Sequence, residues 1–159
     1  MLREIIVHGN KAADATFKAK AAMKTGVAVV KNYKTGTADL PSTDTAENVY
    51  FVQKAPIPTG INASRTNMSD YDDDFNIVAK DEVVVLYQYS AGEEFATDAT
   101  TSLTAEADIG KAVVFGTDGS VKAAPTSTAS LYVYRGEYND AGHKLAWIAV
   151  LDTPIKNAE

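Results

Sequence analysis

The stretch that most constrains the fold is residues 81–98, DEVVVLYQYSAGEEFATD, because its first half is a nearly unbroken run of strand-forming side chains. Residues 83–89 are β-branched, aliphatic or aromatic, and only Gln88 interrupts them. Such a run predicts a strand that has neighbours on both sides rather than one at the edge of a sheet. The rest of the chain is therefore expected to supply its partners.

Similar short runs recur along the chain between turn signals. Gly36, the Asp118-Gly119 pair and residues 139–142 are expected to make hairpin turns, since glycine and asparagine accept the backbone conformations that tight turns require. Strands of this length with no convincing helix predict an all-β fold, a small antiparallel β-barrel or sandwich. The further strands expected on this basis cover residues 27–31, 37–40, 48–53, 111–115, 120–123, 131–138 and 145–151.

The amino-terminal segment is harder to interpret. Residues 2–7, LREIIV, predict a short strand or an arm that pairs elsewhere. Residues 10–23 are compatible with an alanine-rich helix, but Phe17, Ala19 and Ala21 alternate with polar residues, which favours a strand over 16–22. We expect residues 1–25 to form an extended amino-terminal arm or accessory segment and residues 26–159 to form the β-barrel or sandwich domain.

Composition excludes several classes of protein. The absence of cysteine rules out a disulfide framework, a thiolate zinc site and a cysteine nucleophile. Apolar runs are only a few residues long, against the roughly 20 that a membrane-spanning helix needs. A soluble, intracellularly made protein with no membrane partner is expected.

Charge is unevenly distributed. The net charge of −6 disfavours nucleic acid as the main partner, because phosphate binding needs a dense positive surface. Residues 1–34 hold seven basic against two acidic residues (+5), whereas residues 35–159 hold eight against nineteen (−11). A basic segment on an acidic body suits contact with an acidic protein surface, including a neighbouring copy, although a solvated lysine-rich face is the alternative.

No catalytic motif is present, and we expect no enzyme, no catalytic residue and no cofactor. His8 and His143 are the only histidines, and each lies next to a glycine in an expected turn rather than near a second metal ligand. Glu93 and Glu94 are adjacent on an expected strand and would point to opposite faces, so they cannot flank one glycosidic bond.

Residues 54–76 lack periodicity and are expected to form an interaction loop. Its acidic end matches part of a calcium-binding frame, but Phe75 replaces the glycine of that frame and Asp81 replaces its final glutamate. An EF-hand is therefore not expected; a looser cation site and a solvent- or partner-facing loop remain open, and we assign no metal ligand. The residues at positions 1, 3, 5, 7 and 12 of the frame are Asp70, Asp72, Asp74, Asn76 and Asp81.

Tyrosine is frequent in the expected strands, where aromatic side chains pack against cross-strand neighbours more often than they form a sugar-stacking platform. Core packing is therefore expected for Tyr50, Tyr87, Tyr89, Tyr132, Tyr134 and Tyr138.

Several segments together resemble a known family. In order and spacing, FKAKAAMKTGVAVVKN, NVYFVQ, KDEVVVLYQYSAGEEFATD and ADIGKAVVFGTDGSVKAA are similar to segments of the head decoration proteins of tailed bacteriophages, also called cement or capsid-stabilising proteins. The pattern spans residues 16–151 and includes DIGKAV at 108–113. The resemblance implies a β-barrel-like domain on the outside of the capsid that bridges major capsid protein subunits, with an amino-terminal arm that adds a strand to a neighbour.

The resulting functional expectation is a non-enzymatic virion protein, assembled in the host cytoplasm, that binds the major capsid protein lattice and forms a dimer or trimer there. A phage tail or neck subunit and a carbohydrate-binding module are the alternatives. The expected partner-binding residues are Leu2, Ile5, Ile6, Lys11, Lys18, Lys20, Asp72, Asp73 and Asp74.

Overall fold

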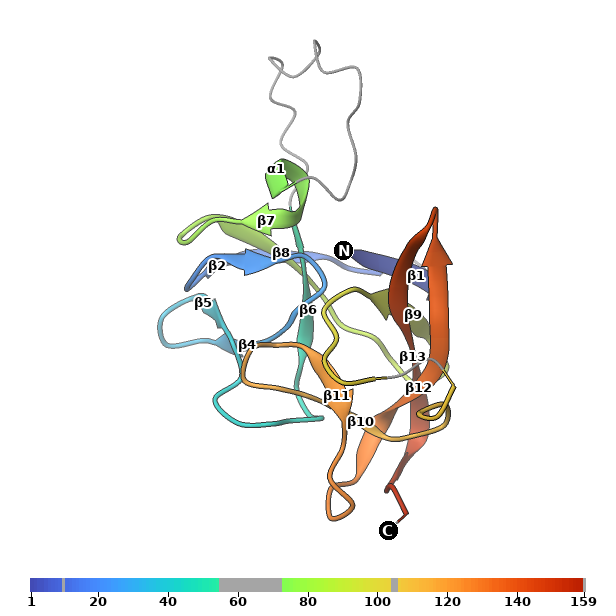
Figure 1. Cartoon of the computed structure of the whole chain (residues 1–159). Coiled ribbons are helices and arrows are strands. Elements are labelled where there is room, and N and C mark those ends of the chain that lie inside the picture. The colour runs from blue at the N-terminus through green and yellow to red at the C-terminus, as the bar shows by residue number, and fades with distance from the viewer. Residues whose placement is uncertain (10, 55–72, 104–105, 159) are drawn as a thin grey trace.

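The computed structural model describes residues 1–9, 11–54, 73–103 and 106–158 (Figure 1). They form an all-β fold with one helical turn, and none of the helices among them has the length and hydropathy to cross a membrane. The elements are β1 (Leu2–Ile6), β2 (Asp14–Ala19), β3 (Met23–Lys24), β4 (Ala28–Asn32), β5 (Thr37–Asp39), β6 (Tyr50–Lys54), α1 (Asp73–Asn76), β7 (Ile77–Val78), β8 (Val83–Tyr87), β9 (Glu94–Thr97), β10 (Val113–Phe115), β11 (Val121–Ala123), β12 (Ser130–Asp140) and β13 (His143–Ile155).

Five strands close into a barrel in the order β2-β5-β4-β6-β8. β8 pairs with β2 on one side and with β6 on the other, which confirms the expected two-sided strand. β2 and β5 pair in parallel, whereas the other barrel pairs are antiparallel. The expected fold class, an all-β barrel, is thus confirmed, with one parallel closure that the hairpin pattern did not predict.

A four-stranded antiparallel sheet in the order β1-β9-β13-β12 stands beside the barrel (Figure 1). β12 and β13 form a long hairpin whose turn, Ala141-Gly142, has positive φ at both residues, 52° and 94°. The β10–β11 hairpin closes against β4, because the Ala28 N–H donates to the Gly119 carbonyl at 2.8 Å. Gly119, at φ 75°, leaves no room for a side chain: a Cβ there would lie 2.5 Å from the Ala28 oxygen.

The core joins the barrel to the four-stranded sheet. On β6, Phe51 points into a cluster between the two, whereas the next residue, Val52, packs inside the barrel. Phe51 is fully buried, and its ring centroid lies 4.4 Å from that of Phe95 on β9 and 5.2 Å from that of Phe115 on β10. Tyr89 and Tyr132 complete the cluster and, with Tyr134, are buried, so core packing is confirmed for these three tyrosines.

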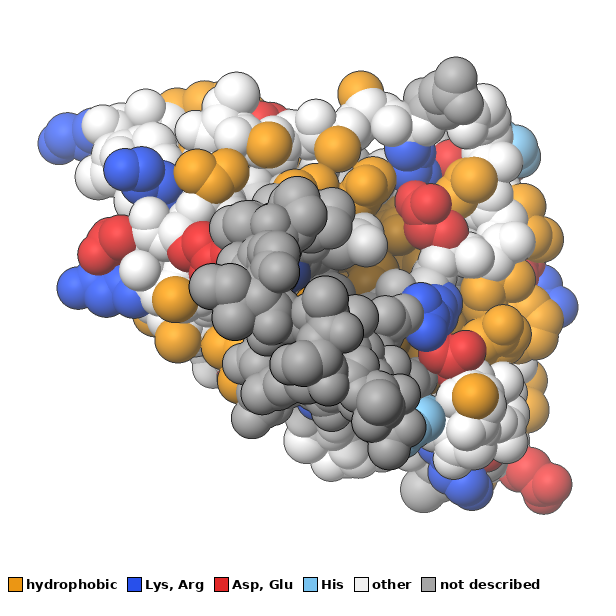
Figure 2. Space-filling model, turned by 90° about the horizontal axis from the view of Figure 1, so that it is seen from above, with side chains coloured by type: hydrophobic (Ala, Val, Ile, Leu, Met, Phe, Trp, Pro, Cys, Tyr) orange, Lys and Arg blue, Asp and Glu red, His pale blue; other side chains and the backbone are white. Residues whose placement is uncertain are grey.

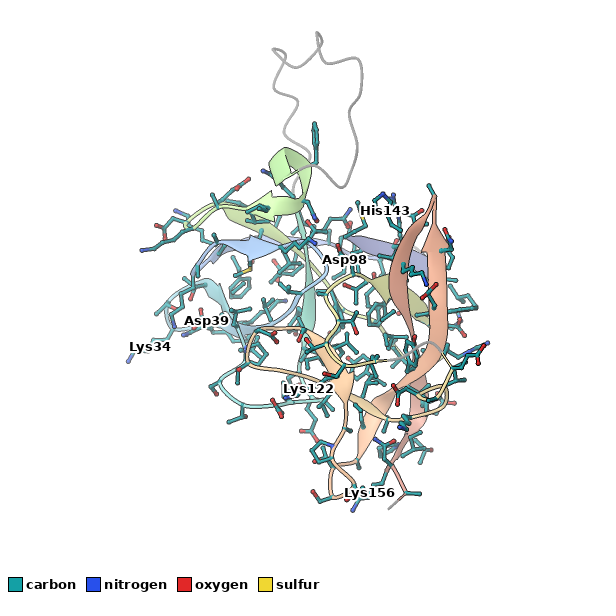
Figure 3. All side chains as sticks on the ribbon, in the orientation of Figure 1. Lys34, Asp39, Asp98, Lys122, His143 and Lys156 are labelled. Carbon is teal, nitrogen blue, oxygen red and sulfur yellow. The ribbon has the colours of Figure 1, made fainter. Side chains whose placement is uncertain are left out.

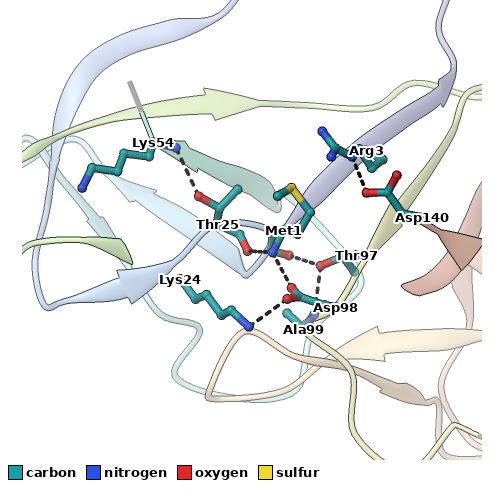
Figure 4. A network of polar contacts seen from close by, with 10 residues as sticks. Met1, Arg3, Lys24, Thr25, Lys54, Thr97, Asp98, Ala99 and Asp140 are labelled. Atoms are coloured by element: carbon teal, nitrogen blue, oxygen red, sulfur yellow. Dashed lines mark hydrogen bonds and ion pairs between the residues drawn. The ribbon is translucent and has the colours of Figure 1, made fainter. Parts of the chain in front are cut away.

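The extended amino-terminal arm is not confirmed. Leu2–Ile6 pairs with β9 of the same chain, and the side chains of Met1 and Leu2 are buried. The Met1 amino group forms an ion pair with Asp98 and donates to the Thr25 carbonyl at 2.8 Å (Figure 4). The segment belongs to the fold because its apolar side chains fill the space beside β9. β2 confirms a strand over residues 16–19 of the expected 16–22, while residues 20–22 lie outside it, and β2 belongs to the barrel.

The integration of β1 is testable with two truncations on the same strand. We expect Leu2→Ala to lower the free energy of unfolding by about 2–5 kcal/mol, because the Leu2 side chain is buried. Ile6→Ala should change it by less than about 1 kcal/mol, because Ile6 is 44% exposed. Urea unfolding measures the free energy of unfolding of both variants. If β1 were a free arm, both variants would lose the same negligible amount of stability.

Candidate partner-binding surface

The structure separates the residues expected to bind a partner. Leu2 is buried in the core, Ile5 is half-buried and Ile6 is exposed, all on β1. Asp72 lies outside the described residues, as do most of the expected interaction loop and part of the cation frame. Asp73 and Asp74 belong to α1.

Lys11 is turned inward. Its ammonium group forms an ion pair with Glu93, donates to the Gln88 carbonyl at 2.7 Å and has only 12% of its side chain exposed. Burial would raise the pKa of Glu93, but hydrogen bonds from Lys11 and from the Ser90 and His8 N–H groups hold that pKa below its ordinary value. Lys11 thus links the amino-terminal segment to the body and leaves little surface for a partner.

The positive charge of residues 1–34 is mostly neutralised within the fold. Five of its seven basic residues form ion pairs with acids, at Arg3–Asp140, Lys11–Glu93, Lys20–Asp39, Lys24–Asp98 and Lys31–Asp14. Among the described residues, Lys18 and Lys34 have no acidic partner within ion-pair distance, and both side chains are exposed. Within residues 1–34, the positive charge without an acidic partner therefore lies on Lys18 and Lys34, which come together at one place in the fold.

That place is the barrel tip, which we define as Lys18, Lys20, Tyr33 and Lys34. Tyr33 and Lys34 lie on the β4–β5 turn, and the Lys18 N–H donates to the Gly36 carbonyl of the same turn at 3.1 Å. Tyr33 is 76% exposed, the largest exposure among the described large apolar side chains. Lys34 projects from the side of the molecule opposite β12 and β13 (Figure 3).

A polar network fixes the conformation of this turn. Asn32 accepts hydrogen bonds from the N–H groups of Lys34 and Thr35 at 3.2 and 3.3 Å, and Gly36 adopts φ 68°, as the sequence predicted. The Asp39 carboxylate accepts from Lys20, Thr37 and Asn32. Burial would raise the pKa of Asp39, but these donors lower it overall. Tyr33 is thus presented on an ordered turn.

The base of the tip is also ordered. The Phe17 ring meets the Tyr33 ring edge-on, with centroids 5.5 Å apart. The Lys31 ammonium lies 3.9 Å from the centroid of the Tyr50 ring and 2.6 Å from the Asp14 carboxylate. The Lys31 and Thr16 hydrogen bonds lower the pKa of Asp14 from 3.8 to about 2. The Tyr33 side chain therefore rests on Phe17, next to this paired lysine.

A shallow hollow of about 570 Å³ adjoins the tip. Met23, Val30 and Leu40 contribute apolar surface to it, and the paired Lys20 and Asp39 lie at its rim. An ordered aromatic side chain, two unpaired ammonium groups and an adjacent apolar hollow are features that protein interfaces use as anchors. The barrel tip is suited to recognise an acidic protein surface.

Other chemistries receive less support from the geometry. Among the residues the structure describes, no three His, Asp or Glu side chains gather as metal ligands would. Glu93 pairs with Lys11, whereas Glu94 binds Arg135 and Trp147. The two carboxylates therefore point in different directions, as predicted for adjacent residues on a strand. Sequence reasoning selected Lys18 and Lys20 but missed Tyr33, whose place in the Asn32–Gly36 turn was the available signal.

Comparisons of this chain with protein-family models, curated proteins and solved structures found no match.

The Asp14–Lys31 pair at the base of the tip predicts a pH-dependent stability. Because folding lowers the pKa of Asp14, the ionised Asp14 carboxylate stabilises the folded state. This contribution to the free energy of unfolding is complete above pH 3.8 and is lost as the pH falls towards 2. Asp14→Asn should therefore cost about 1–2 kcal/mol near pH 6, after allowance for partial exposure, and almost nothing near pH 2.

Urea unfolding at both pH values measures this difference. Asp44→Asn is the matched control: Asp44 pairs with Lys122 at the exposed surface, so it should change stability by less than about 0.5 kcal/mol. An Asp14→Asn loss of the same size at both pH values contradicts the assignment.

Proposed function

We propose that this protein is a non-enzymatic virion structural protein that decorates the outer surface of a phage head and stabilises it by binding the major capsid protein lattice. The observation that carries the proposal is the barrel tip, where two lysines without an acidic partner lie on the same turn region as an exposed tyrosine. The resemblance in the strand and turn pattern to phage head decoration proteins supplies the class of partner.

A chain with a net charge of −6 is repelled by an acidic surface unless it approaches through a locally positive site. Lys18 and Lys34 provide that site, and the ordered turn spares the cost of fixing Tyr33 on binding. On a symmetric lattice many such contacts act together, so modest affinity per copy suffices for retention.

In the proposed contact, the amino-terminal segment does not pair with a neighbouring subunit. β1 already pairs with β9, and Leu2 contributes to the core. Recognition is instead assigned to side chains on the barrel surface, which need no rearrangement of the chain.

A binding experiment with heads tests the proposal. The wild-type protein should co-sediment with expanded heads built from the major capsid protein of the same virus, and rising salt should weaken binding because it screens the lysines. The double variant Tyr33→Ser, Lys34→Glu should bind at least about tenfold more weakly.

Lys156→Glu is the matched control, since Lys156 is exposed far from the tip and the charge change is the same (Figure 3). It should bind as the wild type does. Undiminished binding by the double variant contradicts the role of the tip. Failure of the wild type to bind heads, with binding to tails or necks, points to the alternative structural role. The burial of Tyr89, Tyr132 and Tyr134 removes three of the six strand tyrosines from the aromatic platform that a carbohydrate-binding module would need.

A further inference from the structure

The four-stranded sheet has one face towards the aromatic core and one face turned away from it. Phe95 and Ile148 point into the core, whereas their neighbours Ala96 and Trp147 point outward, as strand alternation requires. We call the outward side the outer sheet face. Its surface side chains are Ile5, Ile6, Ile109, Arg135, Tyr138 and Trp147.

Apolar side chains continue across this face from one edge of the sheet to the other. Met1, Ala96 and Leu145 form its buried floor, with Ile5 and Tyr138 packed on them. Ile109 and Ile6 are 55% and 44% exposed at opposite edges. A space-filling view shows apolar side chains gathered along the side where β12 and β13 lie (Figure 2).

Ile109 belongs to this face because the turn that carries it is bound to β12. The Gly110 N–H donates to the Tyr134 carbonyl at 2.8 Å. Gly136 on β12 lies opposite Trp147 on β13 and has no side chain. A Cβ at residue 136 would lie 3.5 Å from the Ile109 Cδ1 atom. The Ile109 side chain therefore covers Gly136, in space that a larger residue at 136 would fill. Gly136 is the cross-strand neighbour of Trp147, the only tryptophan of the chain.

The polar groups of this face neutralise one another. Glu94 accepts hydrogen bonds from the Arg135 guanidinium and from the Trp147 indole N–H, both at 2.7 Å. The Arg135 guanidinium also stacks over the Trp147 ring, 4.9 Å from its centroid. Arg3 pairs with Asp140 at 2.7 Å. The Trp147 and Arg135 side chains of the face are thus held in place, and each charged group in these contacts has a partner of opposite charge.

We propose that the outer sheet face binds a second copy of this chain. Two molecules that each carry a net charge of −6 repel one another, and they approach at least cost through a face whose charges are paired internally. An apolar, charge-balanced face complements itself across a two-fold axis, and self-association interfaces are more apolar than the average protein surface. A strongly charged partner would find no unpaired charge of opposite sign among these contacts of the outer sheet face.

The inference is independent of the proposed capsid role, because it uses residues on the opposite side of the molecule from the barrel tip (Figures 1 and 3). If both hold, a pair joined through the outer sheet faces presents its two barrel tips at its far ends. Such a pair could bridge two sites on one surface.

Sedimentation velocity over a wide range of protein concentration tests the inference. The wild type should shift from monomer to dimer as concentration rises. Ile109→Asp should raise the dimer dissociation constant by at least about tenfold, because it places an unpaired charge in an apolar contact. Ile6→Asp, at the other edge of the same face, should act in the same direction.

Tyr33→Asp is the matched control: it makes the same charge change at another exposed apolar side chain, on the barrel tip. It should dimerise as the wild type does, and wild-type-like urea unfolding of all three variants confirms that they fold. A wild type that stays monomeric at every concentration overturns the inference. Equal weakening of dimer formation by Tyr33→Asp and Ile109→Asp also overturns it.

Discussion

The burial of Phe51 at the boundary between the barrel and the four-stranded sheet is the interaction on which the rest of the structure depends. β6 contributes alternate side chains to two cores, Phe51 to the aromatic cluster and Val52 to the barrel interior. Phe95 brings the sheet to this cluster and Phe115 brings the β10–β11 hairpin. Without cysteine, this packing takes the place of a covalent link between the parts.

This junction makes the two candidate surfaces parts of one body. The barrel tip is fixed to the barrel through the Asn32 and Asp39 hydrogen bonds, and the outer sheet face is fixed by the Glu94 contacts with Arg135 and Trp147. On the tip the turn that presents Tyr33 is ordered, and on the outer sheet face the Trp147 and Arg135 side chains are held by Glu94, which lowers the entropy lost on binding. One surface has unpaired positive charge and the other has none, so they suit partners of different chemistry.

Local signals in the sequence were sufficient for the fold class but not for long-range pairing. The strand expected at residues 83–89 and the turns at Gly36 and Gly119 follow from β-branched runs and glycine; the structure contains the turns, and the strand as Val83–Tyr87. The fate of the amino-terminal segment was not predictable in this way, because β1 pairs with β9, about ninety residues later. The Lys11–Glu93 ion pair also joins residues far apart in the sequence, and local patterns did not predict it. Charge counted along residues 1–34 suggested a basic arm, whereas folding neutralises most of that charge and leaves Lys18 and Lys34 beside Tyr33.

Native-state hydrogen exchange tests the central claim, that the Phe51 cluster unites barrel and sheet, most directly. It compares the opening free energies of backbone amides on β6 and β8 in the barrel with those on β9 and β13 in the sheet. If the cluster joins the two parts, the slowest amides of both should exchange through a single global opening with the same free energy. Barrel amides that open at a clearly lower free energy, while the sheet stays protected, would contradict the account.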